Sequence, residues 1–148
     1  MSRSMIVLVM LSGCLLIFGN TVQAADESVG QAIIGHWSIA PNEARTKGTL
    51  IFNNNGTYER FETDKDNSSY SVKGPYKINE KQHPCAIDLC VDKCGGAGSE
   101  WTTLFGILRF LDNGQLEIQF SSSSERPEAF PQKPDLGTYL LTRKAVKE

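Results

Sequence analysis

Apolar and polar residues alternate with a period of two along most of the chain beyond residue 35, as they do in β-strands that bury one face. The clearest case is the segment 115–120, where Leu116, Ile118 and Phe120 alternate with glutamine and glutamate. One face of such a strand is buried and the other is in water, which is typical of an antiparallel sheet.

Turn chemistry predicts two tight hairpins, because Asn-Gly supplies the positive φ values that short hairpin turns require. One turn ends in Asn55-Gly56 and the other in Asn113-Gly114. Their arms and the remaining alternating segments give eight predicted strands, at 37–39, 49–52, 57–61, 70–78, 86–91, 101–111, 115–120 and 138–142. We expect a bulge or bend at Gly74-Pro75.

Helical periodicity is confined to the segment 26–34, with Ser28 as its N-cap and Gly35 as its end. Two segments are irregular by composition: the glycine-rich segment 94–99 and the proline- and serine-rich segment 121–137. We expect the second to wrap the domain or to cover one end of it.

Eight short strands joined in sequence order most simply close into an all-β, antiparallel up-and-down barrel with a short N-terminal helix. Closure removes the exposed strand edges that an open sheet would carry. A β-sandwich is the alternative. The interior of an eight-stranded barrel is either filled by side chains or holds one small ligand.

The first 24 residues resemble a secretory signal rather than part of the fold. They contain Arg3, the apolar runs 5–10 and 15–18, and the exit Val22-Gln23-Ala24. We therefore expect a periplasmic or secreted protein with a single domain at residues 25–148 and no transmembrane segment in the mature chain. The alternatives are a retained anchor and a lipid anchor, since Leu11-Ser12-Gly13-Cys14 resembles the lipobox that attaches lipid to a cysteine.

Removal of residues 1–24 leaves Cys85, Cys90 and Cys94, an odd number in an oxidising compartment. Alternation along the strand places Cys85 and Cys90 on opposite faces. This favours a Cys90–Cys94 disulfide that leaves Cys85 free, with Cys85–Cys94 as the alternative. A zinc or copper site with His83 is a further alternative, but the spacing lacks a C-x2-C pair, and we expect no metal and no cofactor.

The sequence gives no support to an enzyme. His36 and His83 are the only histidines, and the serine run at 121–124 lacks the G-x-S-x-G pattern of a nucleophile elbow. The acidic stretch from Glu62 to Asp66 is interrupted by Lys65, and we interpret it as a solvated hairpin end. The formal net charge of −2 is evenly spread, which argues against nucleic acid as a partner.

Gly35-His36-Trp37 is similar to the Gly-x-Trp start of lipocalins, in which the tryptophan closes the barrel floor beneath an arginine from near the last strand. Arg143 is the matching arginine here. The chain also resembles a bacterial lipocalin-like family of uncharacterised exported domains, abundant in planctomycetes, through six further segments: 74–78, 87–89, 106–110, 114–116, 126–130 and 140–144. The resemblance implies a barrel and an exported location, and small-ligand binding follows only by analogy.

These observations predict a binding protein for a small apolar or amphipathic ligand, held inside the barrel. The residues that we expect to bind the ligand or to close the barrel are Trp37, Phe52, Tyr58, Tyr76, Phe110, Phe120, Tyr139 and Arg143. The alternative is an envelope protein that binds another protein, as an inhibitor or immunity-type protein does, through the segment 121–137.

Overall fold

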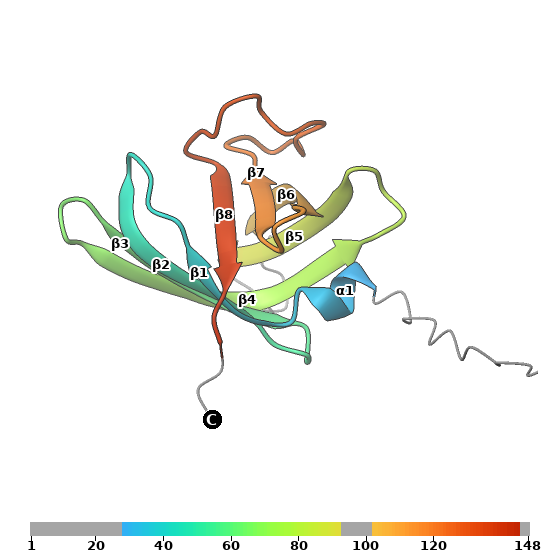
Figure 1. The fold of residues 1–148 in the computed structure, drawn as a ribbon, viewed down its shortest axis with the longest axis horizontal. Coiled ribbons are helices and arrows are strands. Elements are labelled where there is room, and N and C mark those ends of the chain that lie inside the picture. The colour runs from blue at the N-terminus through green and yellow to red at the C-terminus, as the bar shows by residue number, and fades with distance from the viewer. Residues whose placement is uncertain (1–27, 93–101, 146–148) are drawn as a thin grey trace, which may run out of the picture.

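Strands joined by short connections pair antiparallel with their neighbours, and here the pairing continues until the last strand returns to the first. The structure is a computed structural model that describes residues 28–92 and 102–145 (Figure 1). Its elements in chain order are α1 (Val29–Ala32), β1 (Gly35–Ile39), β2 (Arg45–Phe52), β3 (Thr57–Asp64), β4 (Ser69–Asn79), β5 (Cys85–Asp92), β6 (Thr102–Phe110), β7 (Leu116–Phe120) and β8 (Thr138–Arg143). The predicted all-β, eight-stranded barrel is confirmed.

The barrel closes where β8 pairs with β1, in the register Trp37 to Arg143 and Ile39 to Leu141. This pairing leaves neither the first nor the last strand with a free edge. The sandwich alternative is therefore wrong.

Both predicted hairpin turns are confirmed, with Gly56 at φ 78° and Gly114 at φ 77°. Of the bulge or bend expected at Gly74-Pro75, the described pairing shows no bulge: β4 pairs with β3 in one register as far as Pro75 and with β5 from Tyr76 onward. The missing N–H of the proline thus coincides with a change of neighbouring strand. The register shifts lie instead in β2, between Arg45 and Lys47, and near the end of β5.

The helix is shorter than expected, spanning Val29–Ala32. Ser28 caps it as predicted, since its hydroxyl accepts a hydrogen bond from the backbone N–H of Gln31 at 3.3 Å. Helix α1 lies at the end of the barrel where β8 finishes (Figure 1). Within the described part of the chain, no helix combines the length and the apolar character that crossing a membrane requires.

The segment between β7 and β8 lies at the other end of the barrel (Figure 1). From this segment Arg126 donates hydrogen bonds to the backbone oxygens of Ile87 in β5 and Gly106 in β6, at 3.1 and 2.6 Å. Phe130 stacks against Arg109 of β6, with the guanidinium carbon 4.1 Å from the ring centre. The predicted wrapping segment is therefore held to the outer face of the sheet.

Two further expectations fall on residues outside the described ranges and stay predictions. The signal segment 1–24 is one, together with the possible lipid attachment at Cys14. The Cys90–Cys94 disulfide is the other, because Cys94 is not described. Cys85 is a free thiol, as the prediction required.

Candidate functional site

One end of the barrel is sealed by Trp37 and Arg143. The Trp37 ring is fully buried, and its Nε1 donates a hydrogen bond to the backbone oxygen of Ile33 at 2.8 Å. The Arg143 guanidinium carbon lies 4.4 Å from the centre of the Trp37 ring, and Nη1 donates to the Ile34 oxygen at 2.9 Å. Gly35 permits this approach, because a Cβ there would lie 2.9 Å from Arg143 Nη1 and φ is +135°. The structure thus brings Trp37 and Arg143 into contact, and we call this the closed end.

The half of the barrel next to the closed end is filled. Phe52 and Tyr58 are buried completely, and Phe52 meets Tyr76 edge to face at 5.0 Å between ring centres. The Tyr58 hydroxyl donates to the backbone oxygen of Cys90 at 2.8 Å, and burial raises the pKa of this phenol. Phe110 lies 6.2 Å from Trp37 and is 37% exposed at the barrel's edge. These residues fill or seal the barrel and line none of the hollow at its other end.

The opposite end contains a hollow of about 720 Å³. Its inner wall includes the buried side chains of Arg60, Phe120 and Tyr139, and Leu104 adjoins them. Its rim is formed by the start and end of the wrapping segment, with Ser121, Ser122, Pro127, Asp135, Leu136 and Gly137. Of the eight residues expected to bind ligand or close the barrel, Phe120 and Tyr139 line this hollow. We call it the open end.

Three charged residues lie inside the barrel beside this hollow, and we call them the buried charge cluster: Arg45, Arg60 and Glu62. Their exposed fractions are 4%, 9% and 4%. Arg45 Nη1 lies 3.6 Å from Glu62 Oε2, and Arg60 Nε lies 3.8 Å from Glu62 Oε1. Within the described structure, Arg45 Nε, Arg60 Nε and Glu62 Oε1 are buried without a hydrogen-bond partner. Two arginines thus share one carboxylate, with one positive charge in excess.

Two tyrosines surround the buried charge cluster. The Tyr70 hydroxyl donates a hydrogen bond to Glu62 Oε2, and the Tyr139 hydroxyl lies 3.4 Å from Arg60 Nη1. The guanidinium carbon of Arg45 lies 3.8 Å from the centre of the Tyr139 ring. Burial raises the pKa of both phenols, and the bond to Glu62 raises that of Tyr70 further. Both hydroxyls therefore keep their protons at neutral pH.

The buried charge cluster was missed by reading the sequence, and the interpretation of Glu62 as part of a solvated hairpin end is wrong. Strand β3 extends beyond the predicted 57–61, and Arg60 and Glu62 continue the inward alternation that starts at Tyr58. That parity was available in the sequence. Arg45 was not predictable in this way, because the register shift after it turns an outward position inward.

No family model matches the chain, and no curated protein matches it. The resemblance to lipocalins therefore stays a resemblance, and the proposals below are based on the geometry of the barrel.

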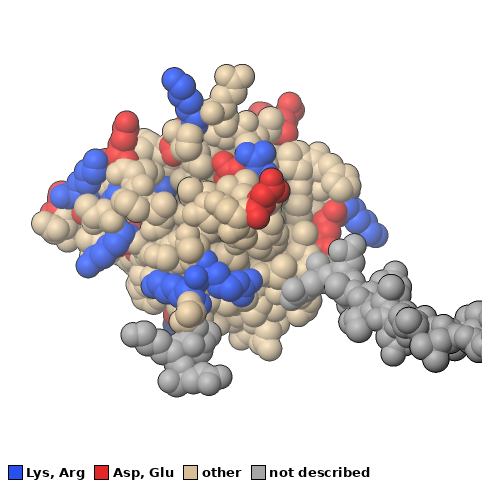
Figure 2. All heavy atoms as spheres, viewed as in Figure 1, with Lys and Arg blue, Asp and Glu red and all other residues tan. Residues whose placement is uncertain are grey.

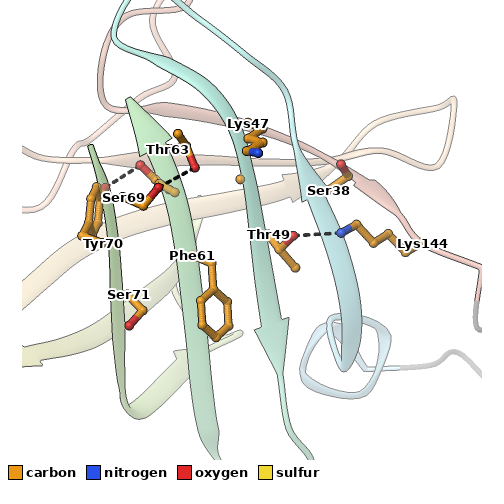
Figure 3. A pocket seen from close by; sticks show the side chains of 11 residues that line it. Ser38, Lys47, Thr49, Phe61, Thr63, Ser69, Tyr70, Ser71 and Lys144 are labelled. Carbon is orange, nitrogen blue, oxygen red and sulfur yellow. Dashed lines mark hydrogen bonds between the residues drawn. The ribbon is translucent and has the colours of Figure 1, made fainter. Parts of the chain in front are cut away.

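A second hollow of about 560 Å³ lies on the outer face of β1 to β4 (Figure 3). Its side chains include Phe61, which is 45% exposed, and polar groups that bond to each other. Lys144 Nζ donates to the Thr49 hydroxyl at 2.8 Å, and the hydroxyls of Thr63 and Ser69 are 2.9 Å apart. Positive and negative side chains are mixed over the face drawn in Figure 2, apart from a short basic band where β8 ends. The open end is the stronger candidate because its inner wall is buried and includes Arg60, whose Nε lacks a hydrogen-bond partner in the described structure.

The cysteine region shows no alternative centre in the part of the chain that the structure describes. No three of its histidine, cysteine, aspartate and glutamate side chains gather as metal ligands would. Cys85 is half-buried, and burial together with nearby Glu80 raises the pKa of its thiol. A protonated thiol is a poor nucleophile and a poor ligand.

Proposed function

We propose that this chain is an exported, lipocalin-like binding protein without enzymatic activity, which takes one small amphipathic ligand into the open end of its barrel. The observation that carries the proposal is the buried inner wall of the 720 Å³ hollow, which combines Phe120 and Tyr139 with the charged Arg60. Ligand sites are typically concave, mostly apolar and furnished with a few placed polar groups.

The size of the hollow supports a small ligand. Pockets for small molecules commonly enclose 300–1,000 Å³, and the 720 Å³ at the open end falls within that range although it is open to solvent. The filled half of the barrel, with Trp37, Phe52 and Tyr58 fully buried, limits how deep a ligand can reach. A ligand of about one short chain and a head group fits this space better than a large fused ring system.

The polar groups at the open end favour binding over catalysis. Glu62 is held by Tyr70 and lies against two arginines. Asp135 on the rim accepts hydrogen bonds from Gln119 and from the backbone N–H of Gly137, which lower the pKa of its carboxyl. The lowered pKa makes the Asp135 carboxylate a poor general base.

Native mass spectrometry of protein purified from its own cells tests the proposal, together with titration of the neutral apolar dye Nile red. We expect bound mass and dye binding in the unchanged protein, and loss of both in Leu104→Trp, which places an indole in the hollow. Phe61→Trp, on the outer face, is the matched control and should bind as the unchanged protein does. Equal dye binding by Leu104→Trp, or a ligand-free protein that binds no dye, would refute the proposal.

A second candidate function is protein binding through the wrapping segment. The observation in its favour is Leu136, which is 62% exposed and is the most exposed large hydrophobic residue of the described chain. An envelope protein that co-purifies with the unchanged protein but not with Leu136→Ser would support this function. A co-purified protein that is retained by Leu136→Ser would contradict it.

A further inference from the structure

We infer that the ligand carries an acidic head group, a carboxylate or a phosphate monoester, and that it enters head first to meet Arg60. This inference rests on the proposed function and names the ligand class for the same site. Three observations carry it: the charge excess inside the barrel, the unpartnered arginine nitrogens, and the polarity of the hollow from its inner wall to its rim.

The charge excess is the first observation. The buried charge cluster contains two guanidinium groups and one carboxylate, on residues that are each exposed by 9% or less. A buried charge without a counter-charge is strongly unfavourable, because the solvation that it loses is not replaced. One bound carboxylate would bring Arg45, Arg60 and Glu62 to zero net charge, and a phosphate monoester would more than balance their excess charge.

The unpartnered nitrogens are the second observation. Arg60 Nε makes no hydrogen bond in the described structure, and its nearest acidic oxygen, Glu62 Oε1, is 3.8 Å away. Arg60 is also the member of the cluster that lines the hollow. A guanidinium binds carboxylate and phosphate oxygens through paired, charge-assisted hydrogen bonds. Arg60 therefore makes the direct contact, and Arg45 adds positive field from behind, where its Nη2 donates to the Thr138 oxygen at 2.8 Å.

The polarity of the hollow sets the direction of entry. Its inner wall holds the buried Arg60, whereas its rim holds the exposed Leu136 and the carboxylate of Asp135. An anionic head left at the rim would face Asp135, and an apolar chain pushed inward would meet the arginines. A ligand that enters with its acidic head group first places this group on Arg60. Its apolar chain then lies between Phe120, Leu104 and Leu136.

Calorimetric titration with four probes that share an eight-carbon chain tests the inference: octanoate, octyl phosphate, octanol and octylammonium. We expect octanoate or octyl phosphate to bind about tenfold or more tightly than octanol, since hydrogen bonds to charged groups contribute the difference. Octylammonium should bind most weakly. The tighter of the two acids distinguishes a carboxylate from a phosphate head group.

Arg60→Met should lower the affinity for the preferred acid about tenfold or more and leave octanol unchanged. Arg60→Lys keeps the charge and should retain part of the preference. Arg109→Met is the matched control, because Arg109 is half exposed on the outer face and pairs with Glu117 at 2.6 Å. It should change none of the four affinities.

Equal binding of octanol and the acids, or an acid preference that survives Arg60→Met in a folded protein, would overturn the inference and leave the proposed function standing. Failure of all four probes and of Nile red would instead remove the proposed function. Circular dichroism and the urea midpoint of each variant separate a lost contact from a lost fold.

Discussion

The two ends of the barrel use the same pair of chemical groups with opposite results. At the closed end the guanidinium carbon of Arg143 lies 4.4 Å from the centre of the Trp37 ring, and at the open end that of Arg45 lies 3.8 Å from the centre of the Tyr139 ring. Arg143 donates hydrogen bonds to the backbone oxygens of Ile34 and Ala32. Arg45 and its neighbour Arg60 share one carboxylate and keep their Nε atoms unpartnered.

The difference lies in how far the polar groups at each end are hydrogen-bonded within the protein. The bonded groups of the closed end seal the barrel, whereas the unpartnered groups of the open end can bind a ligand. At the closed end Trp37 and Arg143 are already packed together and hydrogen-bonded to the backbone, so a ligand would have to displace an existing contact. At the open end a ligand would supply the charge and the acceptors that the protein lacks. Substitutions should therefore cost stability at the closed end and alter charge balance at the open end.

The largest expected loss follows Trp37→Ala. The side chain is fully buried and donates to Ile33, so its removal leaves a cavity and an unpaired carbonyl. We expect the free energy of unfolding to fall by about 3–5 kcal/mol, measured by urea titration. Phe61→Ala, at 45% exposure on the outer face, is the control, with an expected change within about 0.5 kcal/mol. Similar losses from both would mean that the closed end is not the main seal.

Glu62→Gln should have the next largest effect. The amide keeps the shape of the carboxylate and an acceptor for Tyr70, but it leaves two buried guanidinium groups without a counter-charge. We expect a loss of about 3 kcal/mol in the free energy of unfolding. Added octanoate or octyl phosphate should recover part of this loss. A loss below about 1 kcal/mol would indicate that water already compensates the cluster.

Arg143→Met should cost less, because the guanidinium is exposed and its contacts are partly replaced by water. The expected loss is about 1–2 kcal/mol, from the ring contact and the hydrogen bonds to Ile34 and Ala32. Arg143→Lys keeps the charge without the planar donors. Its thermal unfolding temperature should lie between those of the unchanged protein and Arg143→Met. If Arg143→Met leaves the free energy of unfolding unchanged, Trp37 seals this end without help from Arg143.

The smallest effect on stability is expected from Arg60→Met. Unlike the other substitutions, it should leave the free energy of unfolding nearly unchanged or raise it. It removes the excess charge and leaves Arg45 paired with Glu62 at 3.6 Å. The free energy of unfolding should stay within about 1 kcal/mol of the unchanged protein or rise, because well-packed apolar replacements of buried charges are often neutral or stabilising. A loss comparable to that of Glu62→Gln would show that the second arginine stabilises the fold rather than serving a ligand.

Much of the fold could be predicted because the information is local. Period-two alternation located all eight strands, and Asn-Gly placed both tight turns. The contact between Trp37 and Arg143 was expected from the similarity of Gly35-His36-Trp37 to the start of lipocalins. Of the open end, only Phe120 and Tyr139 were anticipated. Arg60 and Glu62 lie on the same face of β3 as Tyr58. Charged residues on a strand are ordinarily predicted to face solvent, however, and alternation alone does not show that these two are buried.

The sequence by itself determined the elements and their order, since turn geometry and side-chain alternation act between neighbours along the chain. The closing pair of Trp37 and Arg143 was expected only from the resemblance to lipocalins. The tertiary structure decided which half of the barrel is filled and where charge is buried. The register shift in β2 turned Arg45 inward, and closure of β8 on β1 brought Tyr139 against it from 94 positions away along the chain. Such a meeting depends on strand register around a closed sheet, and no local pattern encodes it.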